Sequence, residues 1–337
     1  MIPLSVLDLS VVTTGTRPAA ALRNSIDLAR HVDGLGYVRY WLAEHHNLAS
    51  VASPAPDVMI GQIAAVTKHI RVGSGGVMLQ HYSPYKVAEN FNLLANLAPG
   101  RVDLGVGKAP GGLPLSTRAL QQGVNPDEKG RFADQLAQLD NWLSLTPDES
   151  ADESLLATPL APVQADRFLL GASLESATLA ASLDWHFVYA AHLNGDKTLL
   201  RDVVTKWQQL SRRDTLVAVQ VIVAETQAQA DTLAQQVEVW GVELANGQKV
   251  SVASEAQGQA FARQAGSPAV RIARRESAII AGTPEKVRAG LDGLHQQFGI
   301  DEFIIDTPVA EGRARLTSLL LLAQAVAQTQ TLQEVAG

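Results

Sequence analysis

Cysteine is absent from this 337-residue sequence, which excludes disulfides, thiolate nucleophiles and cysteine-ligated zinc. Redox chemistry in this chain would therefore depend on a cofactor. Aromatic residues make up only 5% of the chain and charged residues 18%. The 34 acidic residues outnumber the 27 basic ones, giving a net charge of −7. Because no basic cluster stands out, we expect neither a nucleic-acid surface nor binding to an anionic membrane.

Long apolar runs and targeting signals are also missing. The longest apolar stretch, residues 316–327, is too short and too interrupted by polar residues to span a bilayer. The start of the chain lacks the basic residues and the small-residue cleavage site of a secretory signal. We therefore expect a cytoplasmic protein. The apolar fraction of 46% is ample for a core, and the length fits one large α/β barrel or two ordinary domains.

A strand-and-helix unit repeats along the chain. Strand-like runs begin at Leu4, Tyr37, Ile70 and Arg101, which are 33, 33 and 31 residues apart, and helical patterns follow the first three. Eight strands alternating with helices predict a (β/α)8 barrel, since a doubly wound sheet would need five or six. We expect one domain over 1–337, with insertions at about 110–162 and 225–284, the second of them helical. The other four strand-like runs are 167–172, 185–190, 216–224 and 302–306.

Alternation along the strands predicts which side chains face the barrel axis. Apolar residues of parallel strands turn toward the covering helices, which leaves the opposite face for the axis. That face carries Arg39, Arg71, Arg101 and Asp103 near the strand starts, joined by Asp8 if its strand faces that way. We expect these opposite charges to neutralise one another, as buried charges must.

The ends of the strands predict a site at the C-terminal mouth, where barrel enzymes keep their active sites. Small residues there favour a hollow that accepts a flat or bulky ligand. Glu44-His45-His46 ends the second strand, and since adjacent residues point to opposite sides, only His45 can face the mouth. A neutral histidine there suits proton transfer near pH 7. The glycines expected under the hollow are Gly75, Gly105 and Gly107.

Two neighbouring segments predict a phosphate site. Lys108 ends the fourth strand, and Ser173 and Ser176 lie where the fifth strand passes into a helix. Backbone N–H groups and hydroxyls at a helix start bind anions. Each serine alone is explained as an ordinary helix cap. Because the fourth and fifth strands should be neighbours, the lysine and both serines together predict a phosphate site.

Several segments, in order and spacing, resemble the bacterial luciferase-like family of flavin-dependent monooxygenases. This resemblance implies a (β/α)8 barrel that binds reduced FMN or, in some members, the deazaflavin coenzyme. It implies that O2 is activated through a flavin C4a-hydroperoxide that oxidises a small organic substrate. An NAD(P)H-dependent flavin reductase and a homodimer are the implied partners. The segments are LSVLD at 4–8, WLAEHH at 41–46, IRVGSGGVML at 70–79, VAEN at 87–90 and PGRVDLGVG at 99–107, with further similarity over 168–181, 280–291 and 301–306.

The resemblance also implies roles for individual residues. His45 takes the position of the family's catalytic residue beside the flavin. Gly75 and Gly76 fall where many members have a non-prolyl cis peptide under the flavin ring. Lys108 stands where luciferase has a phosphate-binding arginine, which keeps the charge but loses the two-pronged guanidinium. The family's hydroxyl-bearing positions around the phosphate fall on Ser173 and Ser176.

Further candidates and alternatives remain open on the sequence alone. Gly107 replaces a cysteine of the luminescent enzymes, so light emission is not expected. His81, Tyr82, Arg131 and His192 are additional candidates to face the substrate. The alternatives to a monooxygenase are deazaflavin-dependent hydride transfer on the same barrel and a flavin-binding protein without catalysis. A metal-dependent barrel hydrolase is more distant, because zinc hydrolases on barrels usually place two histidines at alternate positions of one strand.

Overall fold

The structure, a computed structural model, describes residues 2–145, 155–193 and 195–336. Eight parallel strands form a closed barrel in the order β7-β12-β1-β2-β3-β4-β5-β6, with β6 pairing back onto β7. Each of the eight predicted strands corresponds to one barrel strand, so the (β/α)8 prediction is confirmed. The barrel strands are β1 Leu4–Asp8, β2 Arg39–Leu42, β3 Arg71–Met78, β4 Val102–Gly107, β5 Asp166–Gly171, β6 His186–Ala190, β7 Leu216–Val223 and β12 Glu302–Asp306.

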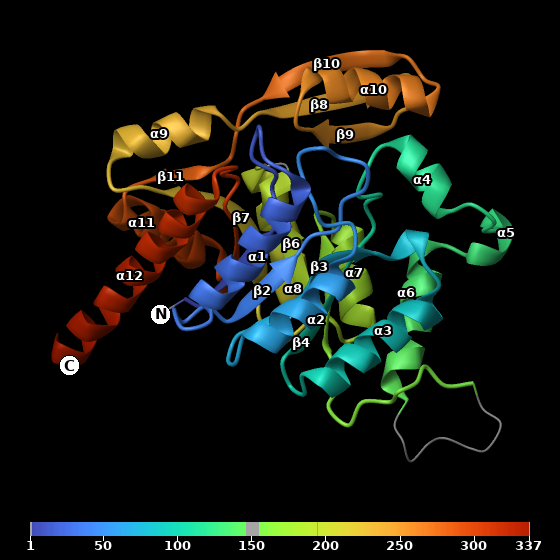
Figure 1. Cartoon of the computed structure of the whole chain (residues 1–337), viewed down its shortest axis with the longest axis horizontal. Helices are drawn as coiled ribbons and strands as arrows, with labels where there is room; N and C mark the ends of the chain where they lie inside the picture. Colours follow the sequence, from blue (N-terminus) through green and yellow to red (C-terminus); the bar gives the residue numbers. More distant parts are fainter. Residues whose placement is uncertain (1, 146–154, 194, 337) are drawn as a thin grey trace.

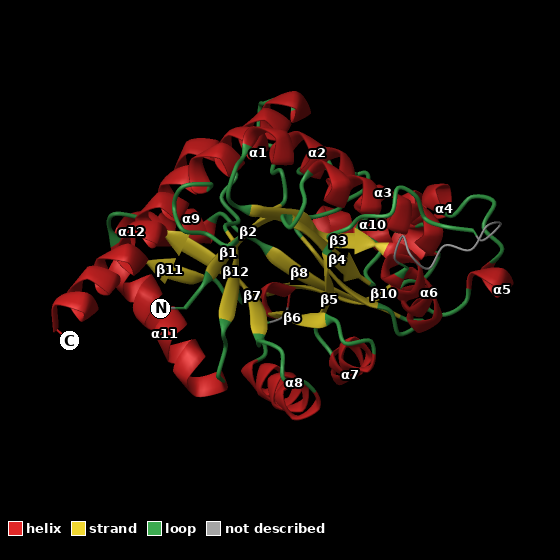
Figure 2. Ribbon diagram, turned by 90° about the horizontal axis from the view of Figure 1, so that it is seen from below, coloured by secondary structure: helices red, strands yellow, loops and turns green. Residues whose placement is uncertain are grey.

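Helices surround the barrel on its outside, as the end-on view in Figure 2 shows. Four of them (α1, α2, α3 and α11) begin with proline in the first turn, where its missing N–H costs no hydrogen bond. Among the described residues, no helix is long and apolar enough to cross a bilayer. The surrounding helices are α1 Pro18–Val32, α2 Pro56–Val66, α3 Pro84–Leu97, α6 Phe132–Ser144, α7 Leu174–Ser182, α8 Lys197–Leu210, α11 Pro284–Phe298 and α12 Gly312–Ala336.

The barrel interior has its own apolar core, separate from the larger core between strands and helices. Its largest members are Trp41 and Phe168, whose rings meet edge to face with centroids 4.8 Å apart. Around them lie Leu7, Val188, Leu216 and Ile304. These side chains fill the middle of the barrel, so a ligand has room only above them at the mouth.

Ion pairs occupy the axis at the strand starts. The fully buried Asp103 carboxylate accepts hydrogen bonds from Arg39 Nη1 at 3.0 Å, Trp41 Nε1 at 2.9 Å and Arg71 Nη2 at 2.6 Å. Arg39 also pairs with Glu302, Nε to Oε1 3.0 Å. The predicted neutralisation is therefore confirmed for Arg39, Arg71 and Asp103, and it closes the N-terminal end of the barrel.

Two of the residues expected at the axis lie elsewhere. Arg101 precedes β4 instead of belonging to it, and its guanidinium donates to the carbonyls of Thr67 and Ile70 between α2 and β3. Asp8 faces the helices, where it accepts from Tyr40 Oη at 2.7 Å and pairs with Arg315 of α12 at 3.0 Å. The prediction was wrong for Arg101 because the strand starts one residue later. Asp8, which was expected at the axis only if its strand faced that way, does not lie there, because β1 turns Leu7 inward instead.

The second insertion combines two helices, α9 and α10, with a small antiparallel sheet, so the expectation that it is helical was right only in part. The strands β8, β9 and β10 form this sheet in the order β10-β8-β9, and with α10 they lie across the C-terminal end of the barrel (Figure 1). Helix α4 of the first insertion contacts α10, with Leu115 N donating to Gln264 Oε1 and Arg118 Nη1 to Gln264 O. The elements of the two insertions are α4 Pro114–Leu120, α5 Pro126–Lys129, α9 Gln227–Gln235, β8 Val239–Leu244, β9 Lys249–Val252, α10 Glu255–Ala265, β10 Ala269–Arg275 and β11 Ile280–Gly282.

Candidate active site

His45 follows β2 at the barrel mouth and is half-buried. Its ring atom Nδ1 is buried and has no hydrogen-bond partner among the described residues. Burial, reinforced by the neighbouring His46, lowers the pKa of His45 to about 4. The imidazole is therefore neutral at pH 7, with one buried ring nitrogen available to a ligand.

A second neutral imidazole belongs to His192, in the short 3-10 helix η3, Ala191–Leu193, that follows β6. Its ring hydrogen-bonds to the backbone of Ala218, while Nδ1 is buried without a partner in the described chain. Burial lowers the pKa of His192 to about 4, and the charge of His45 contributes to this shift. The two histidines follow β2 and β6, which lie at opposite sides of the barrel order, and each has a buried ring nitrogen without a partner in the described chain.

The other face of the β2 end carries a buried carboxylate, Glu44. Its Oε1 accepts hydrogen bonds from His46 Nε2 at 2.6 Å and Tyr82 Oη at 2.8 Å, and its Oε2 accepts from the Met78 backbone N–H at 3.1 Å. Glu44 and His46 thus lie together through this hydrogen bond, and the expectation that His45 is the histidine facing the mouth stays a prediction. Sequence reasoning gave no role to Glu44, although the same alternation places it with His46.

The remaining candidates make hydrogen bonds that account for them. His81 Nε2 donates to the Pro110 carbonyl at 2.8 Å, and its Nδ1 accepts from Gln121 Nε2 at 3.1 Å. Arg131 is 86% exposed in its side chain and caps α6 through Asp134. His81 therefore holds the start of the first insertion, and Arg131 stabilises a helix end.

Gly75 and Gly76 lie where β3 departs from regular pairing with β4, and the peptide bond between them is cis. A Cβ on Gly75 would come within 2.7 Å of Leu7 Cδ1, and a Cβ on Gly76 within 2.8 Å of the Gly105 carbonyl oxygen. Gly105 is more crowded still, because an added Cβ would come even closer to the Ser74 carbonyl oxygen. Close packing of the protein itself thus requires these three glycines, whereas the sequence analysis attributed Gly75 and Gly105 to a ligand hollow above them.

The predicted phosphate residues lie on neighbouring elements. Gly107 pairs with Leu170 of β5, so Lys108 and the start of α7 follow adjacent strands. Ser173 caps α7 by accepting from the Ser176 N–H at 3.2 Å, and the two hydroxyl oxygens are 3.0 Å apart. Lys108 is exposed. The arrangement offers hydroxyls and helix N–H groups beside a long, exposed lysine side chain, a donor set that suits a phosphate.

A buried acid at the mouth was missed by the sequence analysis. Asp306 ends β12, and its Oδ2 accepts from Gln220 Nε2 of β7 at 2.9 Å. Burial raises the pKa of Asp306 to about 6. Its position at the end of the last barrel strand was the available signal. Among the described residues, no group of three or more histidine, aspartate or glutamate side chains could hold a metal ion.

The sequence pattern of the luciferase-like monooxygenase family matches residues 2–302. The chain belongs to this family. Within the luciferase-like monooxygenases, it is 40% identical to the N-acetyl-S-alkylcysteine monooxygenase of Bacillus subtilis (strain 168) over 97% of this chain and 98% of that protein. It is 33% identical to the luciferase-like monooxygenase of Escherichia coli (strain K12) over 95% of this chain and 96% of that one. The recognition of the family and of an enzyme is therefore confirmed.

Solved structures of luciferase-like proteins also resemble this chain in fold. Apo-MsnO8 superposes with a TM-score of 0.77 at 31% identity, covering 97% of this chain and 99% of that one. The oxygenating constituent of 3,6-diketocamphane monooxygenase from Pseudomonas putida, in complex with FMN, has a TM-score of 0.71 at 16% identity, covering 97% and 98%. An F420-dependent secondary alcohol dehydrogenase has a TM-score of 0.64 at 15% identity, covering 96% and 99%. The last two likenesses establish the fold alone.

Proposed function

We propose that this chain is an FMN-dependent monooxygenase that uses reduced FMN and O2 to oxidise a small organic substrate. When bound, reduced FMN supplies the two electrons that bring one oxygen atom to water while the other enters the substrate. The observation that carries the proposal is the pair of neutral imidazoles at the mouth, His45 and His192, each with a buried, unpartnered Nδ1 in the described structure.

The residues at the mouth fit the two ends of FMN. Lys108, Ser173 and Ser176 provide a cation, hydroxyls and the start of α7, which match the chemistry of the phosphate. Gly75 and Gly76 would support the flat ring system, because glycine backbone allows close approach. These five residues would hold the cofactor, and the protein would supply orientation and exclusion of water.

His45 would act as the proton donor or acceptor beside the flavin. Since burial keeps its imidazole neutral, one ring nitrogen can accept a proton and the other can donate one at pH 7. His192 adds a second neutral ring without adding positive charge. The lid formed by β8–β10 and α10 covers this end of the barrel and would exclude water during reaction (Figure 1).

A thioether is the first substrate class to test. The full-length similarity to an N-acetyl-S-alkylcysteine monooxygenase, at 40% identity, supports a small sulfur compound of this kind. In this reaction one thioether, one O2 and one reduced FMN give one sulfoxide, one water and one oxidised FMN, so atoms and electrons balance. The oxygen enters at sulfur, and the two electrons that reduce the second oxygen atom come from the flavin.

We further propose that an NAD(P)H-dependent flavin reductase supplies reduced FMN in the cytoplasm, and that the enzyme is a homodimer. Two neighbouring helices carry exposed apolar side chains that support such an interface. Val58 on α2 is 70% exposed and Leu97 on α3 is 69% exposed. Val66 of α2 is 37% exposed and Leu93 of α3 is 49% exposed.

The experiment supplies the protein with reduced FMN, 18O2 and N-acetyl-S-methylcysteine, and measures label in the product by mass spectrometry. We expect one labelled oxygen in the sulfoxide, lost in His45→Ala while FMN binding persists. Tight binding of reduced deazaflavin in place of FMN would instead favour the hydride-transfer alternative. Unlabelled product, or full activity in His45→Ala, would refute the proposed role of the histidine.

A further inference from the structure

The barrel wall has a break along β7. β6 pairs with β7 only as far as Ala218, and β11 begins to pair at Val221. In the part of the chain that is described, neither strand pairs with Val219 or Gln220, although both of these pair with β12 on the opposite edge. The strand ladder is therefore interrupted over two residues between the end of β6 and the start of β11, where the 3-10 helix η3 lies against β7.

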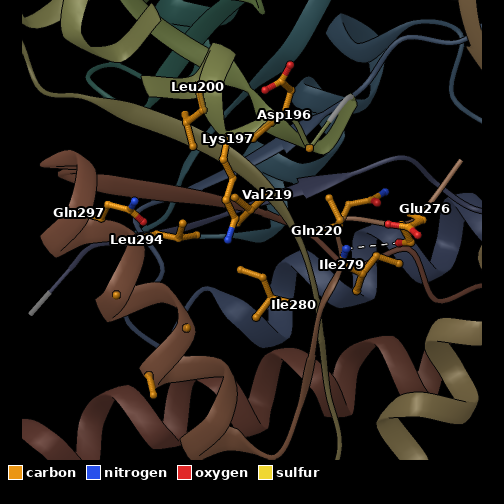
Figure 3. Close-up of a pocket in the computed structure, with 17 residues that line it drawn as sticks. Asp196, Lys197, Leu200, Val219, Gln220, Glu276, Ile279, Ile280, Leu294 and Gln297 are labelled. Atoms are coloured by element: carbon orange, nitrogen blue, oxygen red, sulfur yellow. Dashed lines mark hydrogen bonds between the residues drawn. The ribbon is translucent and has the colours of Figure 1, made fainter. Parts of the chain in front are cut away.

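A cavity of about 760 Å³ lies at this break, between α8 and α11 (Figure 3). It is lined by Val219, which belongs to the outer core, and by Gln220, which turns inward and donates to Asp306 at the barrel mouth. Ala191 also lines it and is directly followed by His192. This lateral cavity thus reaches from the outside of the barrel to the side chains behind the mouth.

Small residues on α11 create the room. Gly290, Gly293, Leu294 and Gln297 line the cavity and follow the three- and four-residue spacing of one helix face. An added Cβ at Gly293 would have no heavy atom within 4 Å. Glycine inside a helix costs about 1 kcal/mol relative to alanine, so these two glycines do not serve the helix itself.

Lys197 is the group that an anion in the cavity would meet, and the carboxylates of Asp196 and Glu276 also belong to the lining. Lys197, at the start of α8, points its ammonium group between Val219 and Leu294 (Figure 3). Among the described residues no ion pair or hydrogen bond engages this ammonium group, and Lys197 is the only described cation in the lining. Asp196 accepts from two backbone N–H groups of α8, and Glu276 lies at the rim beside Arg274 and Arg275 of an adjoining hollow.

We propose that the lateral cavity binds small organic anions that carry a short apolar chain. The carboxylate would lie at Lys197, and the chain would pack on Leu200, Val219 and Leu294 toward the break in the wall. The volume falls within the roughly 300–1,000 Å³ that small-molecule sites occupy. This binding needs neither flavin nor the chemistry of His45, so it stands or falls independently of the proposed monooxygenase reaction.

The test titrates the full-length, flavin-free protein with hexanoate by ligand-observed NMR. Lys197→Gln should weaken hexanoate binding about three- to fivefold, the size expected for a partly exposed ion pair. Lys68→Gln makes the same change at an exposed lysine before β3 and should have no effect. Hexan-1-ol lacks the charge, so the wild type should bind it more weakly than hexanoate. Its affinity should be the same for the wild type and for Lys197→Gln.

A second pair of variants locates the site. Gly293→Leu should abolish hexanoate binding by filling the cavity, whereas Gly293→Ala should retain it. Both replacements improve helix propensity, so thermal unfolding should show both variants at least as stable as the wild type. Unchanged hexanoate binding in Gly293→Leu would overturn the site. Equal affinity in Lys197→Gln and Lys68→Gln would overturn the anion assignment.

Discussion

Nε2 of His46 lies 2.6 Å from Oε1 of Glu44, on the face of the β2 end opposite to His45. The same carboxylate also receives the Met78 backbone N–H at the end of β3. One buried glutamate therefore joins the ends of two neighbouring strands directly behind the residue proposed for proton transfer. The carboxylate thus fixes the residues on either side of His45 in sequence, Glu44 itself and His46.

Replacing Glu44 with glutamine should lower the free energy of unfolding by about 1–3 kcal/mol, the cost of leaving a buried donor unsatisfied. Glutamine keeps the shape and one accepting oxygen, but its NH2 group cannot accept on the other side, where it faces either Met78 N or the pair Tyr82 and His46. Urea denaturation measures the difference. Tyr82→Phe is the matched control, since it removes one donor and should cost about 1 kcal/mol or less. A Glu44→Gln variant as stable as the wild type would contradict this account.

Asp306→Asn should stabilise the protein above pH 6. Because burial raises the folded pKa of Asp306 from 3.8 to about 6, the native state resists its ionisation, and stability is lost as the pH rises through 6. Asparagine keeps an oxygen for Gln220 without the charge. We expect a gain of up to about 3 kcal/mol at pH 7.5, at about 1.4 kcal/mol per pKa unit, shrinking toward pH 4.5. A gain independent of pH would show that ionisation is not its cause.

Lys108→Ala should weaken FMN binding about tenfold, the value of one charge-assisted hydrogen bond. Lys108 is exposed, so stability should change little. Riboflavin, which lacks the phosphate, should bind the variant and the wild type equally, as measured by quenching of flavin fluorescence. Lys108→Arg should restore FMN binding. Equal weakening of FMN and riboflavin would place Lys108 outside the phosphate site.

Val58→Asp combined with Leu97→Asp should convert the proposed dimer to a monomer, because both side chains are exposed and charges would oppose each other across a symmetric interface. Sedimentation velocity at micromolar concentration measures the change. Val270→Asp is the control, since Val270 on β10 is 69% exposed and lies in the lid. A wild type that sediments as a monomer, or a double variant that stays a dimer, would refute this interface.

The barrel strands could be predicted because their alternation is strong. Tyr40 and Leu42 pack outward while Trp41 packs inward, as the pattern indicated. The lid sheet was missed because its strands are half exposed and lack a clear apolar face, and β10 carries three arginines. One signal was present: Asn246-Gly247 joins β8 to β9, and Gly247 has a φ of +84°, as a tight hairpin requires.

The candidate site, too, could be predicted from the sequence only in part. His45 could be selected from strand parity alone, and the neighbourhood of Lys108 and Ser173 follows from strand order. His192 was named only as a candidate to face the substrate, and its place opposite His45 follows from the positions of β2 and β6 in the closed barrel. The crowding at Gly75 also depends on Leu7 and Trp41, which only the folded barrel brings there.

The hydrogen bonds from Leu115 and Arg118 to Gln264 tie α4 to α10 across 149 and 146 positions of the chain. Engineers who transplant a loop from one homologue to another usually move a single segment. Here such a chimera would break the contact at its new boundary, so the α4 and α10 segments should be exchanged as a pair.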